Sequence, residues 1–293
     1  MLHGWFILNK PSGMTSTRAS SLVKRLFDTK KAGHAGTLDP LATGVLPIAL
    51  GNATKTIPYI MDKDKSYCFQ ITWGEQRSTD DLEGEVIAIS SNRPNHDEIL
   101  QKIPQFMGSI EQLPPIYSAI KIKGRRACDR ARSGEIVDLK TRTVRVDSLR
   151  LDHIDSPDTA TFSMDCGKGT YVRSIARDLA LSLGTYGYVS YLERTKVGKF
   201  TLNDAISLEK IRQIAHISEK QEFLHPIRVV LDDIPAVSIS DEQVLKVHQG
   251  QSLLTDLDIG PPLVALYQGE QLVALATLEA GRLYPKKVFK EVF

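Results

Sequence analysis

One loop of the chain holds a single carboxylate in a setting that suits a reactive acid. Residues 33–47 read GHAGTLDPLATGVLP, which places Asp39 five residues after a histidine and directly before a proline. The glycines permit backbone conformations that a side chain would forbid, and the proline biases Asp39 toward extended backbone. An apolar run over residues 45–50 can anchor the loop in a core. Asp39 is therefore a candidate catalytic group on a rigid support, although such a residue taken alone is more often an ordinary turn aspartate.

A basic stretch between Ser118 and Arg150 is the second feature with chemical content. It holds ten basic and four acidic residues, which leaves a local charge of +6 in a chain whose net charge is only +2. A polyanion such as a nucleic acid could dock there and release counterions. Charge alone favours the simpler interpretation, which is a solvated surface of helix and strand.

The composition narrows the class of protein. With 293 residues, of which 42% are hydrophobic and 25% charged, the chain is typical of a globular protein with one large and one small domain. Its three cysteines, at positions 68, 128 and 166, fit neither a zinc motif nor a disulfide framework. No apolar run reaches the ~18 residues of a membrane span, and the N-terminal residues lack the features of a signal peptide. We therefore expect a cytoplasmic protein that does not contact a membrane.

Apolar spacing and turn signals predict strands in separate runs with helices between them, which is typical of an α+β fold. Strands are expected over residues 5–8, 68–73, 85–89 and 161–165, and helices over residues 97–107 and 171–183. The polar residues 78–84 should join the second and third of these strands as a turn. Another helix should begin after a cap at Thr15 or Ser16 and bury Ala19, Leu22, Val23, Leu26 and Phe27.

The pattern changes near residues 225–235, where two prolines punctuate the chain. Beyond them lie short strand-like runs over residues 237–239, 263–266, 272–277 and 287–289, separated by glycines and by a Gly-Pro-Pro turn at residues 260–262. We expect a large domain over residues 1–230 and a small β-rich domain over residues 235–293, built as a barrel of short strands.

Five motifs in a fixed order resemble those of the bacterial tRNA pseudouridine-55 synthases, the TruB family. The loop around Asp39 is similar to the family's nucleophile motif. The other four are NKPSGMTS at residues 9–16, KSY at 65–67, PPIYSAIK at 114–121 and GKGTYVRS at 167–174. The resemblance implies the pseudouridine synthase fold, in which a central mixed or antiparallel sheet is flanked by helices. It also implies that residues 1–230 are the catalytic domain and residues 235–293 a PUA-like RNA-binding domain.

The resemblance further implies an isomerase that flips uridine 55 out of the T-loop of tRNA and converts it to pseudouridine. This reaction breaks an N-glycosidic bond, rotates the base and rejoins it through carbon, so we expect neither a metal nor a cofactor. Asp39 matches the nucleophile, and Arg173 matches the arginine that keeps it ionised and aimed. Tyr67 matches the tyrosine that lies against the base and serves in proton removal. Whether Asp39 attacks the sugar or the base, or forms a glycal-type intermediate, stays open.

Other residues match binding positions of the family. His34 corresponds to a histidine that engages the RNA and helps the uridine to flip, and Tyr171 and Leu192 correspond to the lining of the uracil pocket. Lys10 lies near the active site, where it either packs or contacts a phosphate. Without the motifs, each of these would be an ordinary core or loop residue. An RNA-gripping insertion corresponds to Lys121, Lys123, Arg125, Arg126, Arg130 and Arg132.

Three positions depart from the family pattern. Cys128 stands where an aromatic residue is usual, Tyr188 where a histidine is common, and Glu193 where an arginine is usual. Because Glu193 follows Leu192 directly, an acid at this position could alter RNA contacts near the pocket; the sequence leaves the effect of all three departures open.

We expect a monomer that recognises the T-arm stem-loop of tRNA by its shape and needs no obligatory protein partner. One alternative is an RNA-guided synthase of the archaeal and eukaryotic type, against which the short chain and compact C-terminal module argue. Another is a tRNA-binding or folding chaperone with secondary catalysis, against which the set of Asp39, Tyr67 and Arg173 argues. A glycoside hydrolase is less favoured, because that chemistry normally needs a second paired carboxylate.

Overall fold

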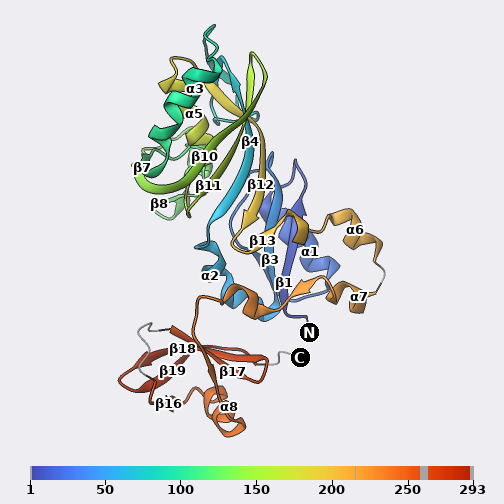
Figure 1. Ribbon diagram of the computed structural model, residues 1–293. Coiled ribbons are helices and arrows are strands. Elements are labelled where there is room, and N and C mark those ends of the chain that lie inside the picture. Colours follow the sequence, from blue (N-terminus) through green and yellow to red (C-terminus); the bar gives the residue numbers. More distant parts are fainter. Residues whose placement is uncertain (1, 215, 258–262, 291–293) are drawn as a thin grey trace.

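Two β-sheets organise the computed structural model, one in each part of the chain (Figure 1). The structure describes residues 2–214, 216–257 and 263–290. In this part of the chain the larger sheet has ten strands and the smaller has five. Two further pairs of short strands lie outside both sheets: β5 (Glu75–Arg77) with β6 (Val86–Ile89), and β8 (Lys121–Ile122) with β9 (Arg125–Arg126).

The larger sheet consists of two antiparallel halves that meet at one parallel contact. The first half contains β1 (Gly4–Lys10), β2 (Ala32–His34), β3 (Thr43–Leu50) and β14 (Leu224–His225). The second half contains β4 (Lys65–Trp73), β7 (Gly108–Gln112), β10 (Arg142–Ser156), β11 (Thr159–Cys166), β12 (Gly187–Val197) and β13 (Phe200–Thr201). The halves join where β3 and β12 run parallel, with Thr43 opposite Glu193 and Gly44 opposite Arg194. This junction brings the start of β3, and the loop before it, against β12.

Helices pack against both faces of the large sheet. The α-helices are α1 (Ser16–Leu26), α2 (Ile57–Met61), α3 (His96–Lys102), α4 (Ala127–Arg132), α5 (Val172–Ser182), α6 (Leu208–Gln213), α7 (Ile217–Gln221) and α8 (Asp241–His248). Short 3₁₀ helices span Gly51–Thr56, Ile103–Phe106, Leu202–Asp204 and Ile227–Val230. Residues of α1 and α5 share one apolar core with β1, β4, β11 and β12. The predicted cap of α1 is confirmed, because the Thr15 side chain accepts a hydrogen bond from the Arg18 backbone N–H.

β1 shows how alternation along a buried strand connects two cores. Phe6 and Leu8 belong to the core beneath α1, whereas Trp5 and Ile7 belong to a second core that includes Leu275 and Phe289 of the C-terminal part. The second core is reinforced by the Lys55 ammonium, which donates to the Val288 carbonyl oxygen at 2.6 Å. The two parts of the chain therefore pack against each other through buried apolar side chains.

The C-terminal sheet has the strand order β15 (Ala236–Ser238), β17 (Leu263–Gln268), β18 (Gln271–Glu279), β19 (Arg282–Val288) and β16 (Leu253–Leu254). This confirms the α+β fold with a small β-rich C-terminal domain. The sheet curls but is not a closed barrel, because β15 and β16 do not pair with each other within the described residues. Sequence analysis missed α8, which begins with a capping box at Ser240. The expected turn at residues 260–262 lies outside the described residues.

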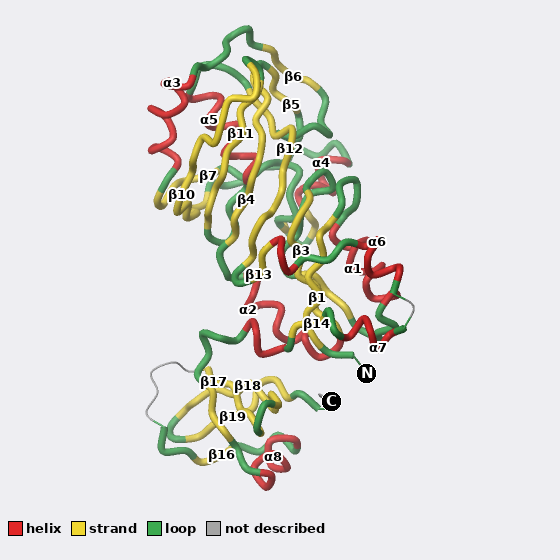
Figure 2. The backbone as a smooth tube through the Cα atoms, turned by 45° about the vertical axis from the view of Figure 1, so that its right-hand side comes forward, coloured by secondary structure: helices red, strands yellow, loops and turns green. Residues whose placement is uncertain are grey.

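Two predictions in the first 110 residues were wrong in detail. β6 pairs with β5 and not with β4, whose neighbours are β11 and β12. The helix predicted over residues 97–107 ends at Lys102 and continues as a 3₁₀ turn, because Pro104 lacks the N–H that a longer α-helix requires. The strand predicted over residues 85–89 is otherwise present as β6, and Figure 2 shows it with β5 beside β12.

Candidate active site

A cavity of about 520 Å³ opens where the two halves of the large sheet meet. It lies between the loop before β3, the strands β4 and β12, and the segment that leads into α5. Five of the residues predicted for catalysis or substrate binding line this cavity, namely Asp39, Tyr67, Tyr171, Arg173 and Leu192. They come from segments up to 153 positions apart in the sequence. The fold therefore gathers into one site most of what the motifs indicated.

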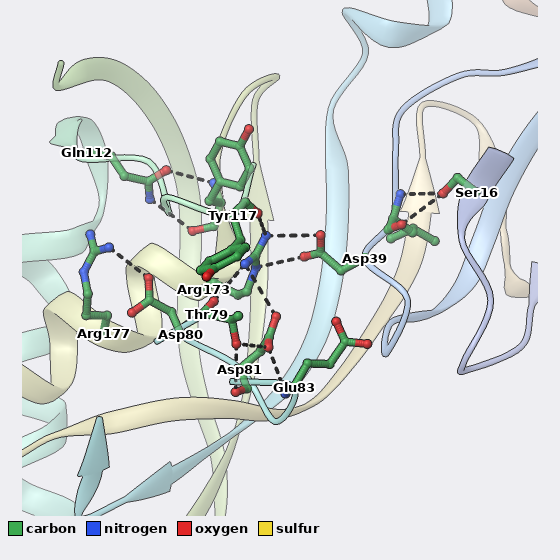
Figure 3. A network of polar contacts seen from close by, with 12 residues as sticks. Ser16, Asp39, Thr79, Asp80, Asp81, Glu83, Gln112, Tyr117, Arg173 and Arg177 are labelled. Atoms are coloured by element: carbon green, nitrogen blue, oxygen red, sulfur yellow. Dashed lines mark hydrogen bonds and ion pairs between the residues drawn. The ribbon is translucent and has the colours of Figure 1, made fainter. Parts of the chain in front are cut away.

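The centre of the site is an ion pair between Asp39 and Arg173 (Figure 3). The Arg173 Nε lies 2.9 Å from Asp39 Oδ2, and Nη2 donates to Oδ1 at 3.1 Å. The Arg173 side chain is 3% exposed, whereas that of Asp39 is 30% exposed. Arg173 thus holds the carboxylate from behind, and Asp39 still faces the open cavity.

Arg173 is itself fixed by groups that sequence analysis did not single out. Its Nη1 donates to the Thr79 carbonyl oxygen at 2.8 Å, and its Nη2 donates to the Tyr117 carbonyl oxygen at 2.9 Å. Asp81, which is 2% exposed, lies 3.5 Å from Nη1 as a second carboxylate on the same guanidinium (Figure 3). The polar turn over residues 78–84 is therefore part of the site, because it supplies a buried counter-charge to Arg173.

Burial raises the pKa of Asp39 above its ordinary value. The charge of Arg173 lowers this pKa, whereas the neighbouring charge of Asp81 raises it. The ionised form of Asp39 accordingly depends on Arg173, because without that cation both burial and Asp81 would favour the protonated form.

Lys10 lies beneath the Asp39 loop and has no access to solvent. Its ammonium donates to the carbonyl oxygens of Pro11, Met14 and Pro40 at 2.9, 2.7 and 3.1 Å. Burial lowers the pKa of Lys10 to about 8. Since three backbone carbonyls occupy the ammonium, we infer that Lys10 fastens the loop. Of the two roles expected for Lys10, packing and phosphate contact, these contacts favour packing, and its place among the substrate-binding residues stays a prediction.

The remaining binding residues fall into two groups. Leu192 and the Tyr171 ring line the cavity, and the Arg142 guanidinium lies 4.8 Å from the centre of that ring. His34 is not among the lining residues but ends β2 beside the loop. Burial, and then the charge of Arg194, lower the pKa of His34, which favours the neutral imidazole. The involvement of His34 in base flipping stays a prediction.

The six basic residues of the predicted insertion lie on β8, β9, α4 and the turn between β8 and β9. Three of them form ion pairs: Arg125 and Arg130 with Glu135, and Arg126 with Asp129. The other three, Lys121, Lys123 and Arg132, have no ion pair within the described residues. The insertion is attached to the cavity, because the Cys128 backbone N–H donates to the carbonyl oxygen of Ser118, a lining residue, at 3.1 Å.

The other two departures from the family pattern lie on β12. The Tyr188 ring packs beneath the Arg77 guanidinium at 4.4 Å and is 7% exposed. Leu192 and Arg194 both line the cavity, so Glu193 points to the opposite face of the strand. The Glu193 side chain therefore lies outside the cavity, because neighbouring residues of a strand alternate between faces, and its effect on RNA contacts stays open.

Arg194 is the lining residue that sequence analysis missed. It is 1% exposed, and its guanidinium donates to the carbonyl oxygens of Val45 and Gly36 at 2.8 and 3.0 Å. Gly36 and Gly44 have φ values of +88° and +96°, and a Cβ on Gly44 would lie 2.3 Å from the Arg194 carbonyl oxygen. The glycines of the Asp39 loop are needed because the loop wraps closely around Arg194. The sequence signal that could have found Arg194 was its position two residues after Leu192, on the same face of a strand.

Two domain families match the chain. Residues 24–172 match the family described as TruB family pseudouridylate synthase (N terminal domain), and residues 173–234 match the tRNA pseudouridylate synthase B C-terminal domain. A protein named tRNA pseudouridine synthase B from Bradyrhizobium diazoefficiens is 48% identical, with 98% of this chain and 86% of that protein covered. Its namesake from Caulobacter vibrioides is 45% identical, with 98% and 96% covered.

Solved structures share the fold. A chain in the crystal structure of a Cbf5–Nop10–Gar1 complex has a TM-score of 0.71 and 26% identity, and the match covers 98% of this chain and 84% of that one. The fold and the cavity thus define a pseudouridine synthase. By its sequence matches, the chain belongs to the TruB family of pseudouridylate synthases.

The close approach of β3 and β12 predicts a large penalty for Gly44→Ala. A positive φ alone costs about 1–3 kcal/mol for a residue other than glycine, and the Cβ would also meet the Arg194 backbone. We expect the free energy of unfolding to fall by at least about 3 kcal/mol in urea denaturation. Gly13→Ala is the matched control, because Gly13 also has a positive φ (+74°) but no atom lies within 4 Å of the place its Cβ would take. Equal losses for the two variants would contradict the proposed crowding.

The raised pKa of Asp39 predicts the pH range in which activity falls on the acid side. A carboxylate that must be ionised loses activity as the pH falls through its pKa, so the midpoint should lie above 3.8, the ordinary value for an aspartate. Asp81→Asn removes a charge that raises this pKa, so the midpoint should move to lower pH even where the rate falls. Single-turnover pseudouridine formation across pH measures both, with circular dichroism confirming that the protein stays folded. Asp80→Asn serves as the control, since Asp80 pairs with Arg177 instead; an unmoved midpoint in Asp81→Asn would contradict the assignment.

Proposed function

We propose that the protein is a tRNA pseudouridine synthase that converts uridine 55 of the T-loop to pseudouridine. The observation that carries the proposal is one carboxylate, Asp39, held by the buried Arg173 at the wall of a cavity that Tyr67, Tyr171 and Leu192 also line. Membership of the TruB family and relatives named tRNA pseudouridine synthase B support the same substrate class.

The cavity residues divide the reaction between them. Arg173 keeps Asp39 ionised as the nucleophile while the bond between N1 of the uracil and C1′ of the ribose breaks. Aromatic contact with Tyr67 partly replaces the stacking that the flipped base has lost. After the base rotates, C5 bonds to C1′, and the Tyr67 hydroxyl is placed to take the proton that C5 loses. The attack of Asp39 on the sugar, its attack on the base and a glycal-type path are all compatible with this division.

Membership of the TruB family, more than the other carboxylates near Asp39, disfavours a glycoside hydrolase. Asp81 is buried behind Arg173, and Asp62 at the cavity wall forms an ion pair with Lys168 at 2.9 Å. Glu83 also lies near Asp39 and has no ion pair within the described residues, so a second carboxyl of the kind that hydrolysis requires is not excluded by geometry and the family match decides between the two classes. The RNA-guided alternative is less favoured as well, because the match to the Cbf5 chain is 26% identical and that to the bacterial relative is 48% identical.

The proposal extends to the rest of the chain. Residues 1–230 would form the catalytic domain and residues 235–293 a PUA-like RNA-binding domain. The last strand of the large sheet, β14, ends at His225, and the first strand of the small sheet begins at Ala236.

The unpaired Lys121, Lys123 and Arg132 would contact the tRNA backbone most strongly. We propose a cytoplasmic monomer that needs no obligatory protein partner. Within the described residues, no helix is long and apolar enough to cross a membrane.

Replacing the nucleophile tests the function directly. Asp39→Asn should keep the binding of a T-arm stem-loop within about threefold while conversion falls by more than roughly 10⁴-fold, because the amide cannot act as an anionic nucleophile. Pseudouridine is mapped by carbodiimide-dependent primer-extension stops, and binding by filter retention. Asp62→Asn is the control and should retain most of the conversion. Unchanged conversion by Asp39→Asn would remove Asp39 as nucleophile, and no stop with the wild type would remove the proposed activity. If the wild type binds and refolds tRNA but produces no primer-extension stop, the alternative of a tRNA-folding chaperone is favoured.

Salt dependence tests the basic insertion. Lys123→Ala should weaken tRNA binding and reduce the slope of log K against log salt by about 1, because one phosphate contact is lost. Arg126→Ala should act in the same direction but less, since Asp129 already neutralises Arg126 at 2.8 Å. Lys24→Ala, on the exposed side of α1, is the control. An unaltered slope for Lys123→Ala would support the alternative interpretation, in which the basic insertion is a solvated surface that does not contact RNA.

A further inference from the structure

Arg194 is a buried cation without a carboxylate partner. It is 1% exposed, and the partners of its guanidinium are two neutral carbonyl oxygens, those of Val45 and Gly36. In the described part of the chain no aspartate or glutamate forms an ion pair with it, in contrast to Arg173 and Arg177 in the same region. A buried charge without a counter-charge is costly. Its presence at the wall of the cavity indicates that negative charge appears beside it during function.

Register places Arg194 against Tyr67. The two residues are directly opposite in the antiparallel pair of β12 and β4, so their side chains share one face of the sheet, and both line the cavity. The guanidinium cannot swing away, because carbonyl oxygens from both arms of the Asp39 loop hold it. Arg194 therefore connects the strand that carries Tyr67 with the loop that carries Asp39.

The charged surroundings of the Tyr67 hydroxyl come from several elements. Burial raises the pKa of Tyr67, whereas the charge of Arg194 and a hydrogen bond with it lower that pKa. Cys166 of β11 and Asp39 act in the raising direction. Lys10, His34 and Lys65 are the other titratable groups near Arg194, and its charge lowers the pKa of each. Arg194 is thus the cation that acts most directly on the hydroxyl.

We propose that Arg194 is a positioning residue that stabilises the deprotonated hydroxyl of Tyr67 at the moment when C5 of the rotated uracil gives up its proton. The inference rests on the proposed function. In this step the C5–H bond breaks and its electron pair forms the C5–C6 double bond. The former C6–N1 π pair moves to N1, which takes a proton from water. Before this step the neutral Tyr67 hydroxyl gives its own proton to the water that protonates N1. The resulting phenolate takes the C5 proton and is neutral again, so the charge beside Arg194 exists only during turnover.

The alternative is that Arg194 only braces the loop through Gly36 and Val45. The two interpretations differ in what Tyr67 contributes. If Arg194 acts through Tyr67, its removal changes the ionisation of that hydroxyl and matters little once the hydroxyl is gone. If Arg194 only braces the loop, its removal harms the enzyme equally with or without the hydroxyl.

The experiment is a double-variant cycle in the full chain. Arg194→Gln is made in the wild type and in Tyr67→Phe, and conversion of a T-arm stem-loop is followed in single turnovers with saturating enzyme. We expect Arg194→Gln to slow conversion on the order of 10²-fold, the lower range for proton-transfer catalysis, with RNA binding changed by less than about threefold. In Tyr67→Phe the same substitution should cost less than about threefold. Arg194→Lys should restore part of the rate, and Lys196→Gln, which removes an exposed cation from the same strand, should have no effect.

A second measurement does not depend on activity. The ultraviolet titration of tyrosinate, taken as the difference between each protein and its Tyr67→Phe counterpart, isolates Tyr67. Arg194→Gln should move this titration to higher pH by at least about one unit, since an opposite charge within a few Å shifts a pKa by that order. The pH at which the single-turnover rate levels off should move in the same direction.

The outcomes separate this inference from the proposed function. Equal losses in both backgrounds, or a Tyr67 titration that does not move, would overturn the role of Arg194 while the wild type still forms pseudouridine. If the wild type forms no pseudouridine, the proposed function fails and the catalytic role of Arg194 with it. In that case a shifted Tyr67 titration would support only the electrostatic link between the two residues.

Discussion

A carboxylate that must be ionised inside a cavity needs a cation behind it, and the architecture around the site follows from that requirement. Arg173 stands 134 positions after Asp39 in the sequence, so the pair exists only when the Asp39 loop and the start of α5 are brought to the same place. The junction of β3 and β12 does this. Arg173 in turn is held by carbonyl oxygens of Thr79 and Tyr117 and by Asp81. Segments from three other regions of the chain therefore converge on one guanidinium.

The junction explains why the loop is rich in glycine. Where β3 starts beside β12, the backbone at Gly44 approaches the Arg194 carbonyl more closely than any side chain would allow. From below, the loop is fixed by Lys10 and by Ser16, whose hydroxyl donates to the Leu38 carbonyl oxygen at 3.0 Å and accepts from the Leu38 N–H at 2.8 Å. The motif over residues 9–16 thus supports the loop. Such closely held backbone can keep a carboxylate aimed without help from the substrate.

Sequence analysis could predict the α+β class, the helix capped by Thr15, and the set of Asp39, Tyr67 and Arg173, because motifs carry that information locally. It left Lys10 open between packing and phosphate contact, since a lysine's three carbonyl partners depend on how two loops pack. It also could not identify Asp81 or Arg194. Their roles follow from burial and strand register; spacing offered one weak signal, the position of Arg194 two residues after Leu192, and none for Asp81. The orientation of Glu193 was hidden for the same reason, because the side of a strand that faces the cavity is set by pairing with β4.

The buried charges of the site do not balance before a substrate binds. Lys10, Lys65, Arg173 and Arg194 bring four cations close to two carboxylates, those of Asp39 and Asp81. Burial lowers the pKa of Lys10 and of Lys65 to about 8, so each lysine keeps its proton at neutral pH only by a narrow margin. A buried arginine cannot lose its charge in this way, because its guanidinium stays protonated in proteins. The excess positive charge therefore remains at Arg194, and the groups able to offset it are those that become anionic during the reaction: the phenolate of Tyr67 and the detached uracil. A site balanced at rest would lose this advantage, since only charge stabilisation that grows toward the transition state accelerates the chemistry.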